Sequence, residues 1–111
     1  MTNYRRTFVP GATYFFTVNL ADRRAMLLVD HIDLLRGAIR YVRRRHPFYI
    51  DAMVVLPDHL HAILTLPSGD ADFPLRWRLM KTWLSRHLPH GERRRASRID
   101  KGERGIWQRR Y

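Results

Sequence analysis

Two histidines separated by one leucine are the residues of this 111-residue chain whose types and spacing best suit chemistry. His59 and His61 begin an apolar run that ends at Leu66 and predicts a strand. Because successive side chains of a strand point to opposite faces, the two imidazoles are expected side by side on one face. Neutral imidazole binds divalent transition metals, and a facial pair leaves positions open for water or a phosphate oxygen. The spacing therefore indicates a metal-binding pair, and a chance pair on a half-exposed strand is the alternative.

Composition restricts both the metal ligands and the partners. The chain has no cysteine, which excludes disulfides, iron–sulfur clusters and cysteine-ligated zinc. It has 21 Lys and Arg against 10 Asp and Glu, a net charge of +11, and only Lys81 and Lys101 are lysines. Arginine binds phosphate through two parallel hydrogen bonds and stacks on bases, so this bias favours nucleic acid as the partner. No signal peptide or apolar run of about 18 residues is present, so we expect a cytoplasmic protein that does not bind a membrane.

The pattern of apolar residues predicts six elements in one domain, residues 1–111. A strand is expected over 13–20, a helix over 31–46 with Asp30 as its N-cap, and an apolar central strand over 48–56. The strand that begins at His59 forms a hairpin with the preceding one. A second helix opens at Pro74, residues 89–105 form an Arg- and Gly-rich loop, and a last strand covers 106–111. The apolar stripe of the second helix consists of Leu75, Leu79, Met80, Trp83, Leu84 and Leu88, with Arg76, Arg78, Lys81 and Arg86 mostly off it.

This order, strand, helix, strand, strand, helix, strand, is that of an α+β, ferredoxin-like fold. Such a βαββαβ chain forms an antiparallel sheet with two helices on one face. The other face stays open, and the alternation places His59, His61, Thr17 and Asn19 on it. The candidate metal site is therefore expected at the centre of the open face.

Several segments carry a resemblance to a known family. The chain resembles the HUH (His-hydrophobic-His) single-strand DNA transposases, specifically the REP-associated tyrosine transposase branch of bacteria. The resemblance covers nearly the whole chain, and the ordered set of segments is specific although each segment alone is weak. The segments are Tyr4-Arg5-Arg6, Tyr14-Phe15-Phe16-Thr17-Val18-Asn19-Leu20 with Arg23-Arg24 after it, Val54-Val55-Leu56-Pro57-Asp58-His59-Leu60-His61, and Gly105-Ile106-Trp107-Gln108-Arg109-Arg110-Tyr111.

The resemblance implies a metal-dependent endonuclease and strand transferase that acts on hairpin DNA through a phosphotyrosine intermediate. His59 and His61 would be catalytic and, with a third polar ligand, would hold Mg²⁺ or Mn²⁺. The family carries its nucleophilic tyrosine and third ligand on a helix after the strand that begins at Ile106, and this sequence stops at Tyr111. We therefore expect DNA and metal binding without the nucleophile, and assign that role neither to Tyr111 nor to Tyr41. The resemblance also fits a nucleoid-associated monomer or weak homodimer.

Basic segments outside the histidine strand are the predicted DNA contacts. Phosphate contact is the expected role of most of them, and the N-terminal arm is best suited to reading bases. One alternative is a non-catalytic RRM-like module that binds single-stranded DNA or RNA, although its usual stacking aromatics are missing from the histidine strand. A zinc-stabilised structural domain is a second alternative, although the other histidines lack ligand spacing. The predicted contacts are Tyr4, Arg5, Arg6, Arg23, Arg24, Arg93, Arg94, Arg95 and Arg98.

Overall fold

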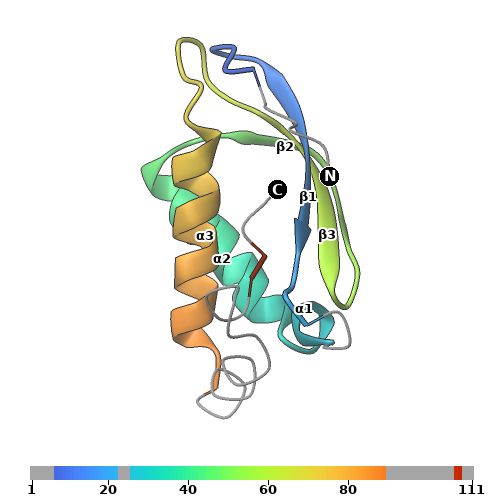
Figure 1. Ribbon diagram of the computed structural model, residues 1–111. Coiled ribbons are helices and arrows are strands. Elements are labelled where there is room, and N and C mark those ends of the chain that lie inside the picture. The colour runs from blue at the N-terminus through green and yellow to red at the C-terminus, as the bar shows by residue number, and fades with distance from the viewer. Residues whose placement is uncertain (1–6, 23–25, 90–106, 109–111) are drawn as a thin grey trace.

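A three-stranded antiparallel sheet and two long helices form the described part of the chain (Figure 1). This computed structural model describes residues 7–22, 26–89 and 107–108. The elements are β1 (Thr13–Asn19), α1 (Leu27–Asp30), α2 (Ile32–Arg45), β2 (Tyr49–Val55), β3 (His59–Thr65) and α3 (Phe73–His87). The predicted α+β class with an antiparallel sheet is confirmed.

The strand order β1-β3-β2 makes the histidine strand, β3, the centre of the sheet. The prediction of a central strand over 48–56 is wrong, because β2 pairs with β3 on one side and forms an edge of the three-stranded sheet. Its apolar residues have two different environments: Met53 packs against the core, whereas Tyr49 and Val54 remain exposed. Composition alone did not separate a strand with two neighbours from an edge strand with exposed apolar side chains.

The predicted last strand, 106–111, is described only at Trp107 and Gln108. Trp107 forms an antiparallel bridge with Leu20, and the Gln108 backbone N–H donates to the Asn19 carbonyl at 3.0 Å. Since β3 occupies the other side of β1, these two residues lie along the free edge of β1. This position is where a ferredoxin-like order places its last strand, and the rest of the segment lies outside the described residues.

Both long helices cover the same face of the sheet (Figure 1). Helix α3 packs over β1, where the Trp77 ring meets the Phe16 ring edge-on at 5.2 Å. Helix α2 begins at Ile32, after the short helix α1, and its N-cap is His31. Asp30 is the last residue of α1, so the prediction of Asp30 as N-cap is wrong. The short helix α1 ends at Asp30, and α2 begins after His31 as a separate helix.

Arg76 is the clearest departure from the predicted helix pattern. Its side chain is only 2% exposed, although the periodicity placed it off the apolar stripe. The guanidinium bonds both carboxylate oxygens of Asp70, at 2.8 and 3.1 Å. It also donates to the carbonyls of His46, Pro47 and Asp72, so five contacts match its five N–H donors. Arg76 thereby ties the start of α3 to the connection between α2 and β2.

Candidate metal site on the open sheet face

The paired histidines lie on the face of β3 that the helices do not cover. Leu60 and Ala62 are buried on the helix side, while His59 and His61 are half-buried on the other side. The two imidazole rings have centroids 4.9 Å apart and planes at 80°. The predicted side-by-side placement of the histidines is confirmed.

Each imidazole is oriented by a neighbour that contacts its Nδ1. His59 Nδ1 lies 2.8 Å from Asp58 Oδ1, and His61 Nδ1 lies 3.0 Å from Thr17 Oγ1 across the β1–β3 pairing. An ionised carboxylate only accepts hydrogen bonds, so the Nδ1–H of His59 donates to Asp58. A histidine that binds a metal through Nε2 usually donates its Nδ1–H to a carboxylate or similar acceptor, because this tautomer leaves the Nε2 lone pair for the ion. The donor set therefore fits a divalent metal.

The described residues supply two ligands of this kind and not three. Within residues 7–22, 26–89 and 107–108, no group of three His, Cys, Asp or Glu side chains is placed to hold an ion. Asn19 pairs with His59 in the β1–β3 register and shares the open face, so its amide is a further polar group on the side of the histidines. The third polar ligand that the family resemblance implies stays a prediction.

The sequence patterns did not predict that Phe15, a surface residue, lies beside the histidines. Its side chain is 54% exposed, and its ring stacks on His61 with centroids 5.7 Å apart and planes at 16°. Phe15 pairs with Ile63, so His61 is its diagonal neighbour across the strands, within reach of an aromatic ring. Phe15 shares the open face with Thr17 because side chains alternate along β1, but only the strand register reveals its contact with His61. An exposed ring here offers a stacking surface for an unpaired base.

The predicted DNA contacts cannot be compared with this geometry. All nine lie outside the described residues: Tyr4, Arg5, Arg6, Arg23, Arg24, Arg93, Arg94, Arg95 and Arg98. Their assignment stays a prediction.

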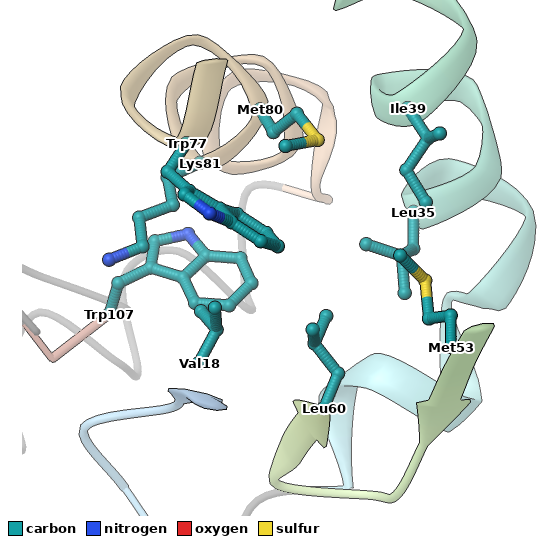
Figure 2. A pocket seen from close by; sticks show the side chains of 9 residues that line it. All are labelled: Val18, Leu35, Ile39, Met53, Leu60, Trp77, Met80, Lys81 and Trp107. Atoms are coloured by element: carbon teal, nitrogen blue, oxygen red, sulfur yellow. The ribbon is translucent and has the colours of Figure 1, made fainter. Parts of the chain in front are cut away.

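A small apolar cavity lies on the opposite side of the sheet, between β-strands and helices (Figure 2). Its volume is about 10 Å³, room for no more than about one water molecule. Lys81 lines the cavity beside Trp107 and donates from Nζ to the Gln108 carbonyl at 3.0 Å. Burial lowers the pKa of Lys81 to about 8. This cavity is a packing feature and not a substrate site.

Two curated proteins with the same family name are similar to this chain. No protein-family profile matches the chain. A REP-associated tyrosine transposase of Escherichia coli K12 is 54% identical over 81 residues, which are 73% of this chain and 49% of that protein. A protein of Haemophilus influenzae, whose name also includes REP-associated tyrosine transposase, is 40% identical over 112 residues, which are 100% of this chain and 64% of that protein.

Solved structures give the same assignment. A REP-associated tyrosine transposase bound to a REP hairpin superposes with a TM-score of 0.78 and 44% identity, covering 99% of this chain and 59% of that one. A Deinococcus radiodurans protein described as a transposase has a TM-score of 0.64 at 18% identity, which shows the fold alone. This chain is an α+β domain with a His-hydrophobic-His strand at the centre of an open sheet, the arrangement typical of HUH-type domains. With these relatives, the chain belongs to the REP-associated tyrosine transposase family.

The chain spans about half to two thirds of the length of these family members. In the part of the chain that the structure describes, no helix is long and apolar enough to cross a membrane.

Proposed function

We propose that this domain binds single-stranded and hairpin DNA and holds a divalent ion, Mg²⁺ or Mn²⁺, between His59 and His61, as the DNA-binding and metal-binding part of a strand-transfer enzyme. The observation that carries the proposal is the orientation of the imidazoles, with both Nδ1 atoms engaged by Asp58 and Thr17. Support for the substrate comes from the family relative bound to a REP hairpin and from the net charge of +11. Such a domain would act beside chromosomal DNA as a monomer or weak homodimer.

The residues of the chain have separate tasks in this proposal. A bound divalent ion neutralises charge on the non-bridging oxygens of a phosphodiester and so makes it a better electrophile. His59 and His61 would hold such an ion, while Asp58 fixes the tautomer and raises the basicity of His59. Thr17 holds the His61 ring in its plane. Phe15 stacks an unpaired base beside the histidines and thus positions the phosphate next to it.

A metal-free DNA-binding module is the second candidate function. It is favoured by the lack of a third His, Cys, Asp or Glu beside the pair among the described residues, and by the exposed Phe15 on a strand of the open face. In that case the open face would bind an unpaired strand as an RRM-like sheet does, by stacking and backbone contact.

Metal binding separates the two candidates. We expect Mn²⁺ added to the full chain to broaden the NMR signals of His59 and His61 selectively, and the variant His59→Ala/His61→Ala to show no saturable Mn²⁺ binding by titration calorimetry. The matched control, His31→Ala/His87→Ala, removes one imidazole at the N-cap of α2 and one at the end of α3, and should bind Mn²⁺ like the original protein. Equal Mn²⁺ binding by all three proteins would refute the metal site.

DNA binding is then measured with a fluorescent hairpin oligonucleotide that carries a single-stranded flank. The proposal predicts that Mn²⁺ tightens binding of the original protein and not of His59→Ala/His61→Ala. If binding is strong, independent of Mn²⁺ and unchanged in the double variant, the metal-free module is the correct function.

A further inference from the structure

The outer surface of α2 carries arginines that neither the fold nor the histidine site explains. Five of its 14 residues are arginine, and three of them follow one another at four-residue spacing. Arg36, Arg40 and Arg44, named here the α2 arginine stripe, are all exposed. Side chains at i and i+4 are neighbours on a helix surface, and like charges there destabilise the helix. The stripe therefore opposes helix formation unless something negative covers it.

Internal partners account for the other arginines of α2 but not for the stripe. Arg43 Nε donates to the Phe48 carbonyl at 3.1 Å, and the Arg45 guanidinium lies 3.9 Å from the centroid of the Tyr41 ring. Within the stripe, Arg36 makes one long, exposed ion pair with Asp33 at 3.8 Å. Among the described residues, the side chains of Arg40 and Arg44 have no hydrogen bond, ion pair or ring contact. Arg44 lies in the last turn, where a cation stabilises the helix dipole, but Arg40 lies in mid-helix, outside the reach of that effect.

The stripe faces away from the sheet. Leu35, Ala38 and Val42 are the buried residues of α2, and at 100° per residue Arg40 lies on the opposite side of the helix. Since α2 and α3 cover the face of the sheet opposite the histidines, the stripe and the histidine pair belong to opposite layers of the molecule (Figure 1). A ligand on the stripe is therefore separate from the ion between the histidines.

We propose that the α2 arginine stripe binds the phosphate backbone of a duplex, namely the stem of a DNA hairpin; this inference rests on the proposed function, since it assumes that hairpin DNA is the ligand. From Arg36 to Arg44 the helix rises about 12 Å, comparable to three or four base-pair steps of about 3.4 Å. Sites for unpaired strands combine basic residues with aromatic surfaces. The stripe has no aromatic member, and the Arg45 guanidinium already stacks on one face of the adjacent Tyr41 ring, so the surface suits phosphates better than unstacked bases.

Salt dependence of binding tests the stripe directly. Each phosphate neutralised by the protein adds about 0.9 to the slope of log affinity against log salt. For Arg40→Gln/Arg44→Gln, we expect the slope on a hairpin to fall by about 1.8 and the affinity to fall roughly 30-fold at 0.15 M salt. The probes are a fluorescein-labelled hairpin with a flank, its blunt stem without the flank, and the flank alone as a single strand.

Arg78→Gln/Arg86→Gln is the matched control, because it removes the same charge from exposed positions of the neighbouring helix α3. The expected result is loss of affinity for the hairpin and the blunt stem in the stripe variant alone, with binding of the flank unchanged. Equal losses in both variants would mean that only net charge matters, and a loss confined to the flank would mean that the stripe binds unpaired DNA; either result overturns the proposal.

The stripe and the metal site fail in distinguishable ways. If stem binding depends on Arg40 and Arg44 while Mn²⁺ has no effect, the stripe stands and the metal site falls. If Mn²⁺ binds at the histidines and the stem binds equally well to both arginine variants, the stripe proposal is refuted and the metal site stands. A chain that binds neither hairpin nor stem refutes the stripe proposal outright.

Discussion

Replacement of the buried Arg76 by methionine should strongly destabilise the domain. Arg76→Met keeps most of the aliphatic volume but removes all five N–H donors, so the carbonyls of His46, Pro47 and Asp72 lose their contacts with the guanidinium. The Asp70 side chain is 36% exposed and keeps its access to water, so the cost falls mainly on the three carbonyls, and a buried acceptor left without its hydrogen bond costs about 1–3 kcal/mol. A small domain has about 5–15 kcal/mol of stability in total. The substitution should therefore remove a large share of it.

Urea unfolding followed by tryptophan fluorescence measures this cost. Arg78→Met is the control, because Arg78 is exposed on the same helix, and such surface changes usually stay within about 0.5 kcal/mol. A cost below about 1 kcal/mol for Arg76→Met would refute the reasoning and would mean that Arg76 is a solvated side chain, as the helix periodicity alone suggests.

The loss of folding stability at acid pH gives an independent check. The hydrogen bonds from Arg76 and from the Asp72 backbone N–H hold the pKa of Asp70 below its usual value. A carboxyl with a lowered folded-state pKa contributes stability above its unfolded pKa, about 3.8, and this contribution is lost as pH falls through the folded-state pKa. Arg76→Met should therefore lose less stability than the original protein when the pH is lowered from 5 to 2. An unchanged acid dependence would show that Asp70 and Arg76 are not coupled.

Three further predictions concern the site and the cavity. Thr17→Val should weaken Mn²⁺ binding by roughly tenfold or more, measured by calorimetry, because His61 loses its orienting contact; unchanged affinity would contradict this role. Phe15→Leu should weaken binding of a single-stranded flank by about 1–3 kcal/mol, whereas Phe15→Trp keeps an aromatic ring and should bind the flank like the original protein. Tyr49→Leu, at the far end of the open face, should have no effect on this binding. Because the pKa of Lys81 is lowered in the folded protein, the unfolded chain binds more protons than the folded protein between pH 8 and 10.5. The free energy of unfolding should therefore rise with pH in this range by on the order of 1–3 kcal/mol. Lys81→Met should abolish that rise, and the same pH dependence in both proteins would refute the prediction.

Local patterns predicted the parts of the structure that depend on alternation along one strand. The period of two in residues 13–20 and from His59 onward fixed which side chains face the helices, because each strand has one covered face and one open face. The same pattern put His59 and His61 together on the open face. Their metal-binding role, in contrast, is not a consequence of the alternation and remains a proposal.

Contacts between distant segments were beyond the reach of these patterns. The position of β2 at an edge follows from its pairing with β3 alone, which an apolar sequence does not report. The contact of Thr17 with His61 depends on the β1–β3 register over a separation of 44 residues. Arg76 was missed for the same reason: its partners include the His46 and Pro47 carbonyls, about 30 positions earlier, and helix periodicity carries no information about them.

The distribution of charge implies a division between the two layers of the domain. The three strands contain no lysine or arginine and one aspartate, Asp51, and Asp58 lies beside His59. Among the described residues, these strands therefore offer the open face no lysine or arginine that would attract a polyanion. Helix α2, which covers the other face of the sheet (Figure 1), contributes five arginines. Phosphate contacts position a nucleic acid and supply most of its salt-dependent affinity. The charges of the described residues therefore favour the proposed arrangement, in which arginines of the helical layer would supply affinity for phosphate and the histidine pair would contact phosphate through a bound divalent ion.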